Sequence, residues 1–308
     1  MNGMISKDTR VLVNVCLLAY NHKNYISQCI DSVLMQKTDF PFEIVLGEDE
    51  SADGTREICM QYASKYPDMI RLFLRSRKDV IYINGSATGR FNLAESLKAC
   101  RGKYTALLEG DDYWTDPLKL QKQVDFLEAN PLYSTCFHRV TEFDEISLNE
   151  KIIPDGPLSQ TMKLNDLLGG NNFIPTNSCV FWNFSSPLPS WFYLTPFGDY
   201  GLHLINAKRG DIGFIDEVMG VYRLSSSGVH GKLKSSNDGL TKAYQQHLDF
   251  WEIIRQTGEF DKDLVQAALN QAVRNLEYYQ QKAKEERKPP SFANAIWKGV
   301  KARILGSK

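Results

Sequence analysis

The sequence predicts an α/β protein in which a mostly parallel central sheet is flanked by helices. Short apolar runs alternate with helical patterns through the first part of the chain, as they do in doubly wound sheets. These runs are continuously apolar, which is typical of strands buried on both faces. A length of 308 residues suits one large α/β domain with an appendage, or two domains.

The first half of the chain supplies strands and helices in alternation. Apolar runs predict strands at residues 11–19, 42–46, 69–74 and 104–108. Helical spacing of apolar residues predicts helices at residues 25–36, 55–66 and 91–99, with a Gly/Ser-rich loop at 84–89. No GxGxxG follows the first strand, so the usual dinucleotide fingerprint is missing.

The second half of the chain is less regular. Pro117 suits the start of a helix, and further strands are expected at residues 133–143, 177–182, 212–215 and 218–222. Proline-containing stretches predict loops at 144–160 and 185–196, and helices are expected at 163–168 and from residue 198. Long helical periodicity then occupies about residues 240–284. We therefore predict an α/β domain over residues 1–231 and a C-terminal helical extension over residues 232–308.

Composition excludes several classes of protein. The formal net charge is -1, so no global field favours nucleic acid, and no nucleic-acid partner is expected. The N-terminus is polar and no apolar run approaches the length of a membrane span, so a cytoplasmic protein is expected. Six scattered cysteines without a CxxC pair predict buried free thiols.

Three carboxylates, Glu109, Asp111 and Asp112, stand directly after the apolar run at 104–108. Open α/β sheets bind ligands outside the carboxyl ends of their strands, so this position favours a ligand site. Gly110 allows a sharp turn or the close approach of a ligand. Crowded carboxylates repel one another unless a cation lies between them, and Mg²⁺ and Mn²⁺ prefer oxygen ligands. The alternative is an acidic turn that follows a core strand and binds nothing.

Five short motifs follow one another along the chain: Ala19-Tyr20-Asn21 with Tyr25 and Ser32, the acidic loop at 48–55, Glu109-Gly110-Asp111-Asp112, Gly198-Asp199-Tyr200, and Tyr222-Arg223 with His230. In this order they resemble the family 2 glycosyltransferases of the GT-A fold, of the type that builds bacterial surface glycans. The resemblance covers roughly residues 10–231. Glu48 and Glu50 depart from the common form of their loop, which leaves open how the base is recognised.

The resemblance implies an inverting transfer of a sugar from a nucleotide-sugar to a hydroxyl of a glycan or lipid-linked acceptor. It implies a UDP-sugar as the commonest donor and a divalent metal, Mn²⁺ or Mg²⁺, as cofactor. The metal would be held by Asp111, Asp112 and His230, and Asp199 would be the catalytic base. The nucleotide-sugar would be bound by Ala19, Tyr20, Asn21, Glu48, Asp49, Arg90, Glu109 and Asp111.

Several of these residues also have simpler interpretations. Asp199 at the start of a helix could be only an N-cap, because a capping role alone would justify an aspartate there. His230 could be a solvated histidine in a Ser/Gly loop, and Arg90 an exposed surface arginine. Trp182 and the aromatic residues at 191–193 either stack on sugar rings or form core, and the sequence does not separate these two roles.

Two other functions stay open beside the transferase. An inactive module of the same fold would bind a nucleotide-sugar without turnover, although the joint presence of Asp111, Asp112 and Asp199 argues against it. A sugar nucleotidyltransferase should carry a Gly-rich basic loop after the first strand, and residues 20–24 contain no glycine.

The C-terminal stretch 292–308 is short, basic and amphipathic. Phe292, Ile296, Val300 and Ile304 recur at four-residue steps among lysines and an arginine. This composition fits an interfacial helix on anionic lipid, which would attach the protein peripherally to the inner face of the cell membrane. A helix packed on the catalytic domain or on a second subunit is the alternative, and both stay open.

Overall fold

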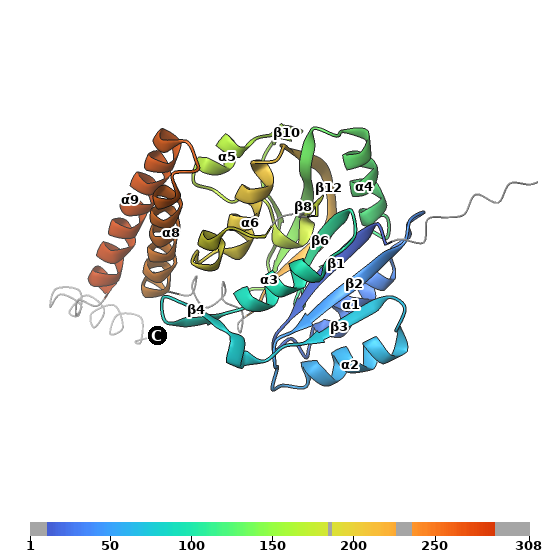
Figure 1. Ribbon diagram of the computed structural model, residues 1–308. Helices are drawn as coiled ribbons and strands as arrows, with labels where there is room; N and C mark the ends of the chain where they lie inside the picture. The colour runs from blue at the N-terminus through green and yellow to red at the C-terminus, as the bar shows by residue number, and fades with distance from the viewer. Residues whose placement is uncertain (1–10, 184–186, 226–235, 287–308) are drawn as a thin grey trace, which may run out of the picture.

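The computed structural model describes residues 11–183, 187–225 and 236–286, and a mixed β-sheet forms its centre (Figure 1). In one half of this sheet the order is β3-β2-β1-β6, and the strands are parallel: β1 (Val13–Ala19), β2 (Phe42–Glu48), β3 (Ile70–Leu74) and β6 (Tyr104–Glu109). The connections between them contain α1 (Ile26–Leu34), α2 (Thr55–Lys65) and α3 (Arg90–Ala99). The predicted parallel, helix-flanked sheet is therefore confirmed for this half.

The other half of the sheet is mixed in direction. β11 (Val180–Trp182) lies antiparallel between β6 and β8 (Tyr133–Asp144), and β12 (Asp211–Leu224) runs parallel to β8. Shorter strands pair antiparallel at the margins: β7 (Tyr113–Trp114) and β10 (Thr161–Met162) with β12, and β9 (Glu150–Ile153) with β8. The helices of this half include α4 (Lys119–Ala129), α5 (Leu164–Leu168) and α6 (Gly198–Ala207), and short 3-10 helices lie at Arg77–Asp79, Thr176–Ser178 and Ser190–Tyr193.

Three segments differ from the prediction. The expected loop at 84–89 belongs to a hairpin of β4 (Ile81–Ile83) and β5 (Ser86–Thr88), whose turn has φ values of 52° at Asn84 and 73° at Gly85. An Asn-Gly pair favours such a turn, and this signal was available in the sequence. The expected loop at 144–160 contains β9, and the two strands expected at 212–215 and 218–222 form the single strand β12, which is interrupted by register shifts.

Both faces of the sheet are covered, which explains the continuous apolar runs. Successive residues of a strand point to opposite faces. In β1, Val15 and Leu17 pack in the core cluster that includes residues of α1 and α4, whereas Cys16 packs in the cluster that includes residues of α3, α5 and α6. All six cysteines are buried and unpaired, as the sequence predicts.

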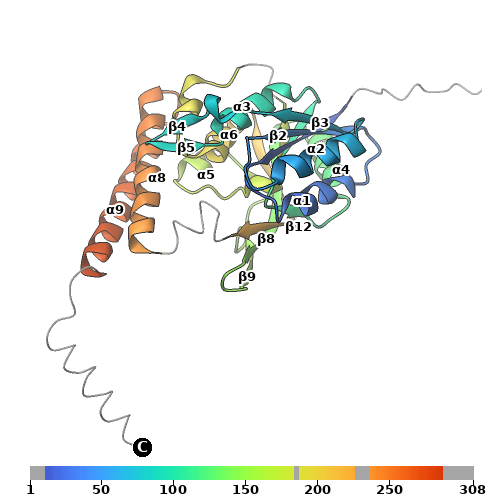
Figure 2. The same cartoon turned by 90° about the horizontal axis from the view of Figure 1, so that it is seen from below.

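The C-terminal helices α8 (Asn237–Thr257) and α9 (Lys262–Glu286) form a hairpin beside α5 and α6 (Figure 1, Figure 2). Phe250 and Trp251 of α8 belong to the same core cluster as Tyr200 of α6, whose ring stacks on Phe250 at 4.8 Å. The helical extension therefore shares its core with the α/β part. The predicted boundary between residues 231 and 232 and the basic stretch at 292–308 lie outside the described residues. Among the helices that the structure describes, none has the length and apolarity needed to cross a bilayer.

Gly47, near the end of β2, is needed for the close packing of α3 on the sheet. A Cβ at this position would lie 2.2 Å from Asn92 Oδ1 and 2.4 Å from Ser96 Oγ, and Asn92 Nδ2 donates a hydrogen bond to the Gly47 carbonyl oxygen at 2.8 Å. We expect Gly47→Ala to lower the free energy of unfolding by about 1–3 kcal/mol, because the added methyl overpacks the interface. Urea denaturation measures this change.

Gly89 is the matched control for this substitution, because it precedes α3 with a φ of -78° and open space around its Cα. Gly89→Ala is expected to lower the free energy of unfolding by less than about 1 kcal/mol, because the methyl meets open space and only the preference of the N-cap for glycine over alanine is lost. Equal stability of the two variants would contradict the packing role of Gly47.

Candidate active site

The carboxylates of Glu109, Asp111 and Asp112 come together at the carboxyl end of β6. One ligand atom from each residue can be chosen so that all lie within 4.8 Å of one another. Asp112 is 1% exposed, and its Oδ2 has no hydrogen-bond partner among the described residues. A buried carboxylate oxygen without a partner is costly unless a cation binds it. These hard oxygen donors therefore fit a divalent cation such as Mg²⁺ or Mn²⁺.

The electrostatics of this acidic cluster also favour a cation. Burial, and then the charges of Asp111 and Asp199, raise the pKa of Glu109 to about 8. Burial, and then the charges of Asp111 and Glu109, raise the pKa of Asp112 well above its ordinary value. Without a cation the cluster consequently holds protons at neutral pH.

Binding of Mn²⁺ is expected to strengthen as pH rises from about 6 to about 8. The raised pKa values mean that a cation must displace protons from the cluster, and each displaced proton weakens apparent binding about tenfold per pH unit below the pKa. The measurement is the Mn²⁺-induced rise in melting temperature at both pH values, each against an EDTA sample. Asp111→Asn is the control, because it removes one donor. A Mn²⁺ effect that is equal at both pH values would contradict the proton competition.

Two further residues lie beside the cluster: His22, which the sequence did not single out, and Arg223, which belongs to the fifth motif. His22 Nε2 lies 3.8 Å from Asp111 Oδ2, and a Cβ at Gly110 would lie 2.6 Å from His22 Nδ1. Arg223 donates from its main-chain nitrogen to Asp112 Oδ1 at 2.8 Å. His230, the predicted third metal ligand, lies outside the described residues.

The predicted nucleotide residues Ala19, Tyr20, Asn21 and Asp49 gather at the ends of β1 and β2. Ala19 is paired with the last residue of β2, and its carbonyl oxygen accepts a hydrogen bond from the Asp49 main-chain nitrogen at 3.0 Å. The Asn21 side-chain oxygen accepts from the main-chain nitrogen of Ala52 at 3.1 Å, so the two loops that follow these strands are tied together.

Arg77 joins the nucleotide residues in space although the sequence did not single it out. Its Nη1 lies 2.7 Å from Asp49 Oδ2, and its guanidinium lies over the Tyr20 ring at 4.3 Å from the ring centroid. Tyr20 is 40% exposed, so part of this residue is accessible to a ligand. Burial raises the pKa of Asp49, and Arg77 opposes this shift.

Glu48 differs from the other predicted nucleotide residues. Its side chain is fully buried, pairs with Arg56, and accepts a hydrogen bond from the Ser51 main-chain nitrogen at 2.7 Å. The carboxylate therefore shapes the loop that carries Asp49 and has no exposed surface to offer a nucleotide.

Asp199 lies in the first turn of α6, and its charge is close enough to raise the pKa of Glu109. Its Oδ2 accepts hydrogen bonds from Asn172 Nδ2 at 3.0 Å and Thr176 Oγ1 at 3.3 Å. The N-cap position of α6 is Phe197, and no side chain in the described ranges forms a capping hydrogen bond there. The structure therefore does not support the simpler interpretation of Asp199 as an N-cap.

Arg90 is 4% exposed, which excludes the interpretation as a surface arginine. Its Nη2 donates to the Thr195 carbonyl oxygen at 2.8 Å, and its guanidinium lies over the Phe192 ring. Its Nε and Nη1 have no hydrogen-bond partner within the described part of the chain, and a Cβ at Gly198 would lie 2.3 Å from Nη1. Burial lowers the pKa of Arg90 to about 10, against the charge of Asp199. The guanidinium of Arg90 thus packs against Gly198, the first residue of α6.

Of the aromatic residues considered for sugar stacking, Tyr193 is half-buried, and the other three pack against neighbouring residues. Trp191 and Phe192 are 6% and 0% exposed and belong to the core. Trp182 pairs with Tyr104 at the start of β6, opposite the end that carries the acidic cluster.

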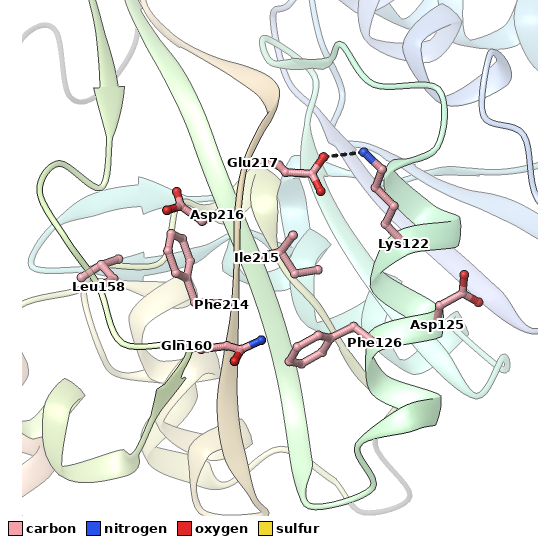
Figure 3. A pocket seen from close by; sticks show the side chains of 9 residues that line it. All are labelled: Lys122, Asp125, Phe126, Leu158, Gln160, Phe214, Ile215, Asp216 and Glu217. Carbon is pink, nitrogen blue, oxygen red and sulfur yellow. Dashed lines mark hydrogen bonds and ion pairs between the residues drawn. The ribbon is translucent and has the colours of Figure 1, made fainter.

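A surface hollow of about 630 Å³ lies elsewhere, between α4 and β12 (Figure 3). Its lining includes Lys122, Phe126 and Glu217 but no residue of the acidic cluster or α6. The part of β12 that lines it lies between Gly213, where β12 pairs with β10, and Gly220, where β12 pairs with β7. This hollow is therefore separate from the candidate active site.

Residues 14–186 match the family model described as Glycosyl transferase family 2. The chain belongs to this family. An uncharacterized protein of Mycobacterium tuberculosis is 35% identical over 243 residues, which are 78% of this chain and 64% of that protein. The chain therefore spans less than two thirds of that relative's length.

Solved structures share the fold of this family 2 chain. TarS of S. aureus, residues 1–349 with UDP, has a TM-score of 0.58 at 15% identity over 93% of this chain and 78% of TarS. The mannosyltransferase PcManGT of Pyrobaculum calidifontis, with GDP-Man and Mn²⁺, has a TM-score of 0.57 at 15% identity over 97% of this chain and 83% of that chain. These similarities confirm the GT-A-like α/β fold.

Proposed function

We propose that this family 2 glycosyltransferase is a metal-dependent, inverting enzyme that transfers a sugar from a UDP-sugar to a hydroxyl of a glycan or lipid-linked acceptor. The observation that carries the proposal is the acidic cluster at the end of β6, with Asp199 within electrostatic reach of Glu109. Family membership supports the transfer of a sugar, and the solved neighbours that hold UDP or GDP-Man support a nucleotide-sugar donor.

The chain divides the binding of the donor between two groups of residues. Asp111 and Asp112, with Glu109 beside them, would hold Mn²⁺ or Mg²⁺, which when bound supplies Lewis-acid stabilisation of the departing diphosphate. Tyr20, with the Asp49–Arg77 pair, would bind the base, because a half-exposed ring offers stacking and the pair offers hydrogen bonds.

Asp199 would accept the proton of the attacking acceptor hydroxyl. Its Oδ2 is oriented by Asn172 and Thr176, which leaves its other oxygen for the acceptor proton. Direct attack of the acceptor oxygen on the anomeric carbon inverts the configuration at that carbon, because the diphosphate leaves from the opposite face.

The acceptor we propose belongs to a bacterial surface glycan that is assembled at the cytoplasmic face of the membrane. The motifs of the chain resemble that class, and a lipid-linked acceptor would give the basic stretch at 292–308 a use at the membrane surface. Liposome flotation with and without residues 289–308 tests the attachment, and equal binding by both forms would contradict it.

An assay of nucleotide release tests the proposed activity. UDP-, GDP- and dTDP-sugars are supplied in turn with Mn²⁺, with Mg²⁺ and with EDTA. We expect release from one UDP-sugar that depends on the metal. Calorimetric binding of a UDP-sugar without release under any condition, with acceptor glycans supplied, would favour the inactive binding module. Absence of both binding and release would overturn the proposal.

A further inference from the structure

We propose that Arg223 is a positioning residue that holds the acidic cluster in its metal-binding arrangement, and that Tyr25 and Glu145 fix Arg223 for this task. This inference rests on the proposed function, in which the cluster binds a divalent cation. It assigns a role to a side chain that reaches the cluster from the far end of β12 and cannot itself bind a metal.

Arg223 donates hydrogen bonds to two successive residues of the acidic cluster, Asp111 and Asp112. Its main-chain nitrogen donates to Asp112 Oδ1 at 2.8 Å, and its Nη1 donates to the main-chain carbonyl oxygen of Asp111 at 2.6 Å. The guanidinium binds the main-chain carbonyl oxygen of Asp111 and leaves the side-chain carboxylate of that residue unengaged. The Asp111 carboxylate therefore stays available to a cation while its backbone is held.

The guanidinium of Arg223 is fixed by its surroundings. It lies over the rings of Tyr113, at 4.5 Å from the centroid, and Tyr25, at 5.1 Å. Its Nη2 donates to Gln28 Oε1, and the side chain is only 9% exposed. Contacts of a cation with aromatic faces and a hydrogen bond to a neighbouring side chain leave little rotamer freedom.

Glu145 connects this arginine to the turn between β8 and β9. Its Oε2 accepts from the Tyr25 hydroxyl at 2.7 Å, and its Oε1 lies 3.9 Å from Arg223 Nε. The main-chain nitrogen of Glu145 also donates to the carbonyl oxygen of Leu224 at 3.2 Å. The turn thus holds both the side chain of Arg223 and the end of the strand that carries it.

The cluster needs such support because its carboxylates repel one another. One donor oxygen of each of Glu109, Asp111 and Asp112 lies within 4.8 Å of the others, so a loop without support would relax by moving the carboxylates apart. Spreading the donors would weaken cation binding, since residues that orient the ligands of a metal contribute strongly to its affinity.

The test measures Mn²⁺ binding without donor, by the electron paramagnetic resonance of free Mn²⁺, in the full-length protein. Arg223→Lys is expected to weaken Mn²⁺ binding at least about tenfold. Tyr25→Phe keeps the ring and loses only the hydrogen bond to Glu145, so it is expected to weaken binding about threefold to tenfold. Excess Mn²⁺ should restore sugar transfer in Tyr25→Phe, which a general loss of structure would not allow.

Tyr62→Phe is the matched control. The Tyr62 hydroxyl donates a hydrogen bond to Oδ1 of Asp31, a residue of α1, at 2.9 Å. This bond also links a tyrosine to a carboxylate, but neither residue belongs to the acidic cluster. We expect this variant to bind Mn²⁺ as the wild type does.

Hydrogen–deuterium exchange gives a second readout that needs no metal. Arg223→Lys should accelerate exchange in the peptide that covers residues 109–114 and leave the peptide over β2 unchanged. Unchanged exchange together with wild-type Mn²⁺ affinity in both variants would overturn the positioning role while the proposed function stands. A wild type that binds no Mn²⁺ overturns both, because the cluster then holds no cation for Arg223 to position.

Discussion

Asp111→Asn is expected to lower the rate of sugar transfer about a thousandfold, because several kcal/mol of charge stabilisation by the metal would be lost with its ligand. Asp111 is the best member of the acidic cluster to change. Its side chain is 19% exposed, whereas Asp112 is buried and bonded to Arg223. An amide also removes one of the repelling charges, so the stability of the metal-free protein should not fall. Nucleotide release at saturating donor, with a melting curve in EDTA, measures both effects.

Asp125→Asn is the control for Asp111→Asn. Asp125 is an exposed residue of α4 that lines the separate hollow beside β12, and it should transfer sugar at the wild-type rate. If Asp111→Asn kept full activity in Mn²⁺, the acidic cluster would not be the metal site. If it lost activity only by unfolding, the cluster would be structural.

The parallel half of the fold could be predicted because its signals are local. Continuous apolar runs in β1, β2 and β6 follow from burial on both faces, and the helices between them show their spacing directly. β9 could not be found this way. Its residues are mostly exposed and pair only with the extended end of β8, so no apolar alternation marks them.

In the candidate active site too, residues that are close in sequence could be predicted, and contacts between distant residues could not. The acidic cluster is contiguous in sequence, and its position at a strand end indicates its use. Arg77 matters through a partner far away in the chain, Asp49, and a single arginine carries no local pattern. Arg223 belongs to one of the five motifs, but its contact with the carbonyl oxygen of Asp111 depends on the fold. The burial of Glu48 and its pairing with Arg56 were hidden for a related reason, since both depend on the folded loop.

Asp199→Asn is expected to lower transfer about a hundredfold to ten-thousandfold, the usual contribution of a general base. The amide keeps the shape of the side chain but cannot take the acceptor proton. Binding of UDP should be unchanged and binding of Mn²⁺ should not weaken, because Asp199 is not among the clustered metal donors and its charge raises the pKa of Glu109. Transfer in saturating donor and acceptor, with calorimetry of UDP, separates these two quantities.

Asp166→Ala distinguishes catalysis from an effect on a helix terminus. Asp166 also lies in the first turn of a helix, but its Oδ2 accepts from the Lys163 main-chain nitrogen at 2.7 Å in a capping box on α5. Loss of that cap should lower stability by about 0.5–2 kcal/mol and leave transfer intact. Asp199→Asn should lower transfer and leave stability intact, because Asn172 and Thr176 bind the Asp199 carboxylate and no helix cap depends on it. If Asp199→Asn lost stability but kept its rate, Asp199 would be structural and the acceptor proton would have to leave by another group.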